Sequence, residues 1–83
     1  MRLLYFAWVR QRIGKSEELL DKPPSVTNVS NLVEYLRQRG PNYEAAFRDP
    51  ALLRVALNQQ HTDFNAVIHA DDEVAFFPPV TGG

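Results

Sequence analysis

Large apolar side chains alternate between two faces at the start of the chain. Residues 3–9 fit a β-strand, with one face formed by Leu3, Tyr5, Ala7 and Val9 and the other by Leu4, Phe6 and Trp8. Gly14-Lys15 gives a turn signal, and a weaker strand over residues 17–21 would return beside the first strand as a hairpin. The prolines at 23 and 24 end that strand, because proline cannot donate a hydrogen bond to a β-ladder.

The clearest helical pattern begins after Asn28. Asn28 suits the N-cap, because its side-chain oxygen can accept a hydrogen bond from a free amide of the first turn. An apolar stripe then recurs at helical spacing, at Val29, Leu32, Val33 and Leu36. Arg37 and Arg39 suit the negative end of the helix dipole. We expect Gly40 to form a left-handed cap and Pro41 to prevent the helix from continuing.

The second half of the chain predicts a short helix and two strands. A helix over residues 42–48 would turn Tyr43, Ala46 and Phe47 inward and would end before Pro50. Alternation over residues 52–57 predicts a third strand, followed by a turn at 58–60. Residues 64–69 fit either a short strand or a single turn, whereas 73–77 predict a final strand after a turn at 71–72. This order predicts an α+β domain with one sheet and its helices on one side.

Composition narrows the class of protein. The 83 residues are 45% hydrophobic and 23% charged, which indicates one globular domain. The net charge of -1 gives no excess of basic residues for binding nucleic acid. The sequence contains no run of about 18 apolar residues, which a membrane-spanning helix would need. Without cysteine there is no disulfide scaffold, thiolate nucleophile or cysteine-based zinc site. No export signal is visible, so we expect a cytoplasmic location.

Two other groups of polar residues carry little chemistry. His61 and His69, with Asp71 and Asp72, match no usual metal-site spacing, so we expect no metal. The serines show no arrangement with histidine that would indicate a nucleophile.

The last six residues, Pro78-Pro79-Val80-Thr81-Gly82-Gly83, form the most informative segment. Two prolines stiffen the exit from the final strand, and the side chains then shrink to two glycines. A Gly-Gly end alone is most often a frayed terminus. The prolines directly after a strand favour a tapering tail that enters a narrow enzyme channel, where glycine permits close backbone approach. We expect a domain over residues 1–78 and a flexible tail over 79–83.

Three segments resemble one known family, in the expected order along the chain. Residues 72–83, from Asp72-Glu73-Val74 to Thr81-Gly82-Gly83, resemble the end of the molybdopterin synthase small subunits, which are ubiquitin-like sulfur carriers. Residues 4–10, with Gly14 beyond, and residues 55–58 are also similar. Two positions depart from the family: residues 70–73 lack its Asp-Gly-Asp-Glu turn, although Asp71 tolerates a left-handed conformation better than most residues. His61 stands where an apolar contact residue is expected.

The resemblance implies a β-grasp fold, with one mixed sheet, and a role in molybdenum cofactor biosynthesis. It implies that an E1-like enzyme uses ATP to adenylate the Gly83 carboxylate, and that a sulfur donor converts it to a thiocarboxylate. The tail (Pro79, Val80, Thr81, Gly82 and Gly83) would then enter the synthase large subunit and give sulfur to a pyranopterin precursor. Catalytic residues would belong to that subunit, in a complex of two small and two large subunits. The chain itself would bind no cofactor.

Phe6, Trp8 and Phe77 form a candidate partner-binding patch. If helices cover the Leu3 face of the first strand, these aromatic side chains gather on the exposed face, which indicates protein binding. With the opposite face buried, Phe6 and Trp8 would instead be core residues.

Three other functions remain open. A related sulfur carrier could serve thiamine, cysteine or transfer-RNA chemistry. A ubiquitin-like modifier would join target lysines through the same activated carboxyl, although with only two lysines, Lys15 and Lys22, the chain is poorly suited to forming polymers of itself. A plain binding module would tolerate loss of Gly83.

Overall fold

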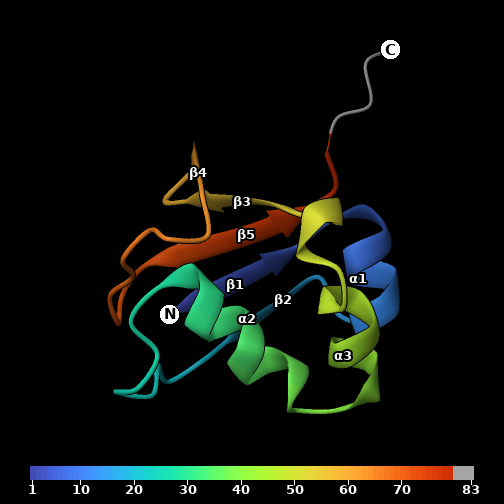
Figure 1. Cartoon of the computed structure of the whole chain (residues 1–83), viewed down its shortest axis with the longest axis horizontal. Helices are drawn as coiled ribbons and strands as arrows, with labels where there is room; N and C mark the ends of the chain where they lie inside the picture. Colours follow the sequence, from blue (N-terminus) through green and yellow to red (C-terminus); the bar gives the residue numbers. More distant parts are fainter. Residues whose placement is uncertain (80–83) are drawn as a thin grey trace.

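Five strands form one mixed sheet in the computed structural model, which describes residues 1–79 (Figure 1). The elements in chain order are β1 (Arg2–Tyr5), α1 (Ala7–Ile13), β2 (Glu17–Leu19), α2 (Val29–Arg37), α3 (Pro41–Phe47), the 3-10 turn η1 (Pro50–Leu52), β3 (Arg54–Leu57), β4 (Gln60–Thr62) and β5 (Glu73–Phe77). The strand order is β2-β1-β5-β3-β4. β1 and β5 are parallel, and the other neighbouring pairs are antiparallel.

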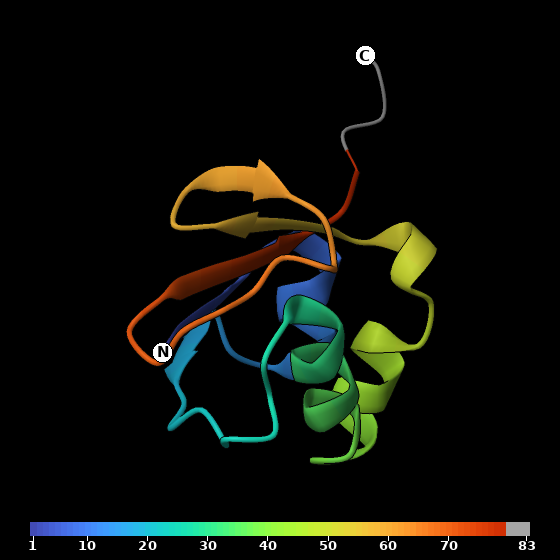
Figure 2. The same cartoon turned by 60° about the vertical axis from the view of Figure 1, so that its left-hand side comes forward.

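One face of the sheet carries the core, and the three helices lie on that side (Figure 2). The register pairs Tyr5 with Phe76 and Phe76 with Val55, and all three side chains are buried. Phe47 of α3 packs edge-on against Phe76, with ring centroids 5.0 Å apart, and 6.3 Å from Tyr5. Such aromatic contacts add to the free energy gained from burying apolar area. The α+β layout with helices on one face, expected of a β-grasp domain, is confirmed.

The predicted strand over residues 3–9 is wrong after Tyr5. Phe6 is still extended, and its amide donates to the Phe76 carbonyl at 3.1 Å, but Ala7 then has φ of +55° and the chain enters α1. Val9 and Ile13, one helical turn apart, are buried. Gly14, at φ of +93°, ends the helix in the left-handed conformation that glycine adopts most readily. α1 therefore separates β1 from β2, which pair as predicted but without a tight turn.

The helix after Asn28 is confirmed at its start and along its apolar stripe, but its end differs from the prediction. The Asn28 side chain accepts a hydrogen bond from the Asn31 amide at 2.8 Å. α2 ends at Arg37, and the Arg39 amide closes a tighter turn on the Leu36 carbonyl at 3.0 Å. Gly40 is therefore not a left-handed cap: its φ of 166° is extended, and it precedes α3 as the N-cap residue. Pro41 begins that helix, where its missing amide costs no hydrogen bond.

The last third of the described chain contains one unexpected strand. β5 lies where predicted, whereas β3 begins two residues later than predicted, because Leu52 ends the 3-10 turn η1. Asn58 and Gln59 form a two-residue turn with φ of 50° and 69°, one residue shorter than predicted. β4 follows this turn as an exposed edge strand, which its polar sequence did not predict. Residues 63–69 then run past the start of α2, where the Ser30 amide donates to the Phe64 carbonyl at 2.9 Å. Asp71 does not adopt the left-handed conformation expected there.

Candidate functional site

The base of the tail lies where the two central strands end. β5 runs parallel to β1, so Pro78 and Pro79 leave the sheet beside the point where β1 passes into α1 (Figure 1). The hydrogen bond from the Phe6 amide to the Phe76 carbonyl joins the two strands at this point. The sequence-predicted tail residues Val80, Thr81, Gly82 and Gly83 lie outside the described residues.

Phe6 and Phe77 lie at the ends of these two strands, on the face opposite the core. Tyr5 and Phe76 pair in register and are buried beneath the helices, so alternation directs the next residue of each strand to the other face. The Phe6 side chain is 49% exposed and that of Phe77 is partly exposed. The structure therefore places Phe6 and Phe77 close together, next to the base of the tail.

Trp8, the third residue of the predicted patch, belongs to a different surface. It lies on α1, because the strand predicted for residues 7–9 is helical, and its side chain is partly buried. The Arg12 guanidinium lies over its ring, 4.5 Å from the centroid, and Trp8 lines a hollow with Ala45 of α3 and Leu52 of η1. Trp8 is thus neither a fully buried core residue nor a neighbour of Phe77 on the exposed sheet face.

Near the tail, the sheet face opposite the core has small side chains at its centre and polar side chains at its margin. Across the sheet, Arg54 pairs with Phe77, Ala56 with Ala75, and His61 with Ala56. The two alanines leave room for the Phe77 ring, which meets the His61 ring edge to face with centroids 5.2 Å apart. We call the surface formed by Phe6, Arg54, His61 and Phe77, around the nearly covered Ala56 and Ala75, the outer face.

Charges on this side of the sheet are balanced at one end only. Arg2, at the end far from the tail, contacts the carboxylates of Glu17 at 2.7 Å and Glu73 at 3.7 Å. Arg54 is exposed, and its side chain donates to the Leu53 carbonyl at 3.0 Å. Within residues 1–79, no carboxylate lies at ion-pair distance from Arg54. The Arg54 guanidinium therefore lies beside Phe77 without an ion pair among the described residues.

Glu18 forms a polar cluster on the core side, which the sequence did not reveal. Its carboxylate accepts hydrogen bonds from the phenols of Tyr5 and Tyr43, both at 2.7 Å, and from Arg39 at 3.0 Å. Burial alone would raise the pKa of Glu18, but the hydrogen bonds from Tyr43, Tyr5 and Arg39 outweigh it and lower the pKa. The cluster joins β2 and β1 to α3 and the end of α2. It therefore stabilises the sheet that carries the outer face.

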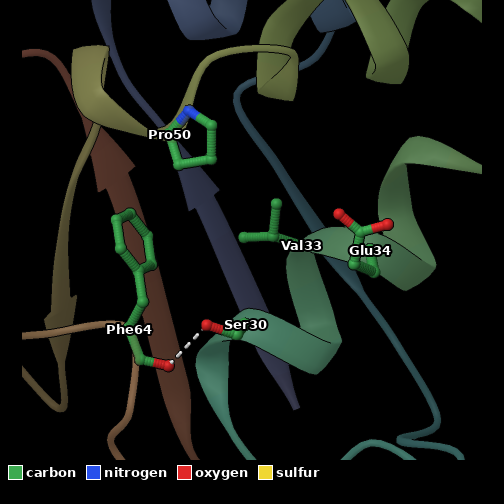
Figure 3. A pocket seen from close by; sticks show the side chains of 5 residues that line it. All are labelled: Ser30, Val33, Glu34, Pro50 and Phe64. Atoms are coloured by element: carbon green, nitrogen blue, oxygen red, sulfur yellow. Dashed lines mark hydrogen bonds between the residues drawn. The ribbon is translucent and has the colours of Figure 1, made fainter.

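A hollow of about 120 Å³ between α2, η1 and the segment at Phe64 offers no catalytic arrangement (Figure 3). Ser30 lines it, but its hydroxyl donates to the Phe64 carbonyl at 3.1 Å, and the side chains of Val33, Pro50 and Phe64 make the lining largely apolar. Within residues 1–79, no three His, Asp or Glu side chains are grouped to hold a metal ion. That part of the chain also contains no helix long and apolar enough to cross a membrane.

Comparisons with known proteins decide the family. The sequence matches the ThiS family over residues 3–83. This chain belongs to the ThiS family. Two relatives that match its whole length are molybdopterin synthase sulfur carrier subunits. The subunit from Haemophilus influenzae is 35% identical, and the match covers 100% of this chain and 99% of the relative. One from Escherichia coli is 36% identical with the same coverage.

Solved structures agree on the fold of this ThiS-family chain. A putative molybdopterin converting factor subunit 1 from Pyrococcus furiosus is 27% identical with a TM-score of 0.76, covering 95% of both chains. SAMP1 from Haloferax volcanii is 24% identical with a TM-score of 0.77, covering 100% of this chain and 98% of that one. A chain from the Helicobacter pylori complex of subunits 1 and 2 of molybdopterin-converting factor is 18% identical with a TM-score of 0.65, covering 99% and 96%. The last two likenesses support the fold alone.

Proposed function

We propose that this chain is the sulfur carrier subunit of a molybdopterin synthase. The observation that carries the proposal is its full-length similarity to subunits of that name, at 35% and 36% identity, including the Gly-Gly end of the sequence. The fold supports it, because the central strand β5 ends at the base of the tail, beside the apolar pair Phe6 and Phe77 on the face opposite the core.

The proposed chemistry takes place at the Gly83 carboxyl. A carboxylate is a poor electrophile, so an E1-like enzyme first joins it to the α-phosphate of ATP and releases pyrophosphate. A sulfide equivalent from a sulfur donor then attacks the acyl carbon, AMP leaves with one of the original oxygens, and a thiocarboxylate remains. In the synthase the thiocarboxylate sulfur bonds to a pyranopterin precursor, and water then cleaves the acyl–sulfur bond, so the sulfur stays on the precursor and the tail returns to a carboxylate. The chain acts as co-substrate: it binds no cofactor itself, and ATP belongs to the activating partner.

The synthase large subunit is the partner that would receive the tail. The Helicobacter pylori relative was solved as a complex of subunits 1 and 2, which supports a paired assembly for proteins of this fold. Phe6 and Phe77 lie beside the base of the tail, so a protein that takes up the tail would meet them first. Apolar side chains of this size are common anchors of protein interfaces. Trp8 would contact the partner only if the partner also covers α1, because Trp8 lies on that helix.

Intact mass spectrometry tests the sulfur-carrier chemistry directly. The chain is incubated with a candidate adenylating enzyme, ATP and sulfide, and we expect the mass gain of one oxygen exchanged for sulfur. The gain should be absent when Gly83 is deleted and when ATP is omitted. With an enzyme shown to be active on another carrier, no mass gain would contradict the proposal. Stable adducts on lysine side chains would instead support a ubiquitin-like modifier.

A further inference from the structure

The outer face combines apolar side chains with two polar groups that have no carboxylate partner within residues 1–79. We propose that it docks on a partner surface with an apolar centre flanked by carboxylates, which pair with Arg54 and His61. This inference rests on the proposed function, because it names the chemistry of the surface that receives the tail.

Arg54 supplies the first argument. It lies directly opposite Phe77 in the β3–β5 register, so a protein that covers Phe77 also covers or borders the guanidinium. Covering the charged guanidinium without a partner is costly. Its only side-chain hydrogen bond among the described residues is to the Leu53 carbonyl. A carboxylate on the partner would offset that cost and add a bidentate contact.

His61 supplies the second argument. Its ring rests against Phe77 while remaining exposed on β4, and its side chain has no hydrogen bond within residues 1–79. Docking over Phe77 would remove water from the imidazole N–H group. A buried donor without an acceptor is unfavourable, so a fitting partner places an acceptor there. An apolar partner surface alone would fit a leucine at this position better than histidine.

The charge pattern selects carboxylates as the acceptors. The acidic strand residues on this side of the sheet, Glu17 and Glu73, lie by Arg2 at the far end and are already in ion pairs. Asp63, which follows β4 next in register to Arg54, accepts a hydrogen bond from the Asn65 amide at 2.8 Å and forms no ion pair with Arg54. The end beside the tail therefore presents a guanidinium that has no ion-pair partner within residues 1–79. Complementary charges guide association and determine the relative orientation of two proteins. An acidic partner surface would therefore align the outer face while the tail enters.

Binding measurements with matched variants test the inference. The probe is the molybdopterin synthase large subunit from the same organism, titrated with the intact chain, Arg54→Ala, His61→Leu and the control Arg48→Ala. Arg48 is exposed and lies at the end of α3, on the helical side of the sheet. Its substitution by alanine removes the same positive charge as Arg54→Ala. We expect Arg54→Ala to weaken binding roughly 5- to 20-fold at about 0.05 M salt, with most of the difference lost at about 0.5 M. Arg48→Ala should change the affinity less than about 2-fold.

His61→Leu gives an outcome that distinguishes the two kinds of partner surface. We expect about 10-fold weaker binding, because leucine would leave the partner carboxylate buried and unpaired. Tighter binding by His61→Leu, or unchanged binding by Arg54→Ala, overturns the inference while the proposed function stands, since the unaltered chain still binds. If the unaltered chain itself binds no large subunit, the proposed function fails and the inference fails with it.

Discussion

The phenol of Tyr43, on α3, donates a hydrogen bond to the carboxylate of Glu18, on β2, at 2.7 Å. Tyr5 donates to the same oxygen, and both tyrosines are buried. Glu18→Ala would leave two buried hydroxyl groups without an acceptor, so we expect a loss of about 2–4 kcal/mol in the free energy of unfolding. Thermal denaturation should show a Tm roughly 10–25 °C lower.

Two variants control for this effect. Glu18→Gln keeps an acceptor for the phenols but loses the charge facing Arg39, so we expect a loss of only about 1 kcal/mol. Glu17→Gln removes a carboxylate from an exposed ion pair with Arg2 and should change stability by less than about 0.5 kcal/mol. Equal Tm values for Glu18→Ala and Glu17→Gln would contradict the structural role of the cluster.

Acid should destabilise the protein in a defined pH range. Burial opposes ionisation of Glu18 and Asp72, but hydrogen bonds outweigh it and lower the pKa of each below the ordinary values of 4.5 and 3.8. The folded state then binds fewer protons than the unfolded state, so this stability is complete at neutral pH. It is lost as the pH falls through 4.5 and below. Tm should be nearly constant from about pH 7 to 5.5 and then fall, less steeply for Glu18→Gln. The same slope in both proteins would exclude Glu18 as a source.

The turn between β3 and β4 can be improved. Gln59 has φ of 69°, where a side chain costs about 1 kcal/mol and glycine is preferred. Gln59→Gly should therefore raise the free energy of unfolding by about 0.5–1 kcal/mol in urea denaturation. Asn58→Gly is the contrasting variant, because it removes two hydrogen bonds. The Asn58 side-chain amide donates to the Asp72 carboxylate at 3.1 Å, and its oxygen accepts from the Glu73 backbone amide at 3.0 Å. This variant should be less stable than the unaltered chain, and a gain in stability would contradict the turn geometry.

Ala7 is the point at which the chain leaves the sheet for α1. Its φ of +55° suits glycine and strongly disfavours a β-branched side chain. We expect Ala7→Val to cost about 1–2 kcal/mol, and Ala7→Gly to change stability by less than about 0.5 kcal/mol, because lower strain offsets greater freedom of the unfolded chain. Chemical denaturation of both variants checks this order. A valine variant as stable as the glycine variant would show that the chain can enter α1 another way.

Phe77 offers a functional prediction with a natural control. Phe77→Asp places a charge on the outer face, so binding to the synthase large subunit should weaken by more than about 10-fold. Leu19→Asp changes a side chain that is 83% exposed on β2, at the opposite edge of the sheet, and should leave the affinity within about 2-fold. Equilibrium titration measures both. Equal weakening in the two variants would indicate a partner that covers the whole sheet, or none specific to this face.

Sequence patterns predicted the elements whose local signals agree. α2 has an Asn28 cap and a four-residue apolar stripe within one segment, and both are observed. Residues 3–9 are apolar at every position, so alternation and helical spacing fit them equally well. The spacing of Val9 and Ile13, with Gly14 after them, was the signal that would have identified α1. β4 has only polar residues and therefore gave no alternating pattern. It forms as an edge strand because backbone hydrogen bonds to its one neighbour, β3, do not require its side chains to be buried.

The candidate site divides in the same way. Alternation alone predicted that Phe6 and Phe77 lie on the exposed face, as observed. The terminal motif predicted the tail, whose residues 80–83 lie outside the described part of the chain. Trp8 lies away from that face because it belongs to α1. The sequence did not predict this, because the chain enters α1 through a single residue with positive φ, Ala7. The Glu18 cluster could not be foreseen, because Tyr43 is 25 residues away in sequence and only the packing of α3 brings it to β2.

The central position of β5 has a consequence for synthesis on the ribosome. Its two neighbours are β1, made first, and β3, so the sheet cannot close until Phe77 has emerged from the exit tunnel. Pairing of the first strand with the last is the most distant contact in the sheet and brings the greatest loop-closure entropy cost. A chain that stops before β5 would lack the central strand of the sheet. Pairing of the sheet is therefore delayed until residues 1–77 have been synthesised, so the strands cannot assemble one after another during translation.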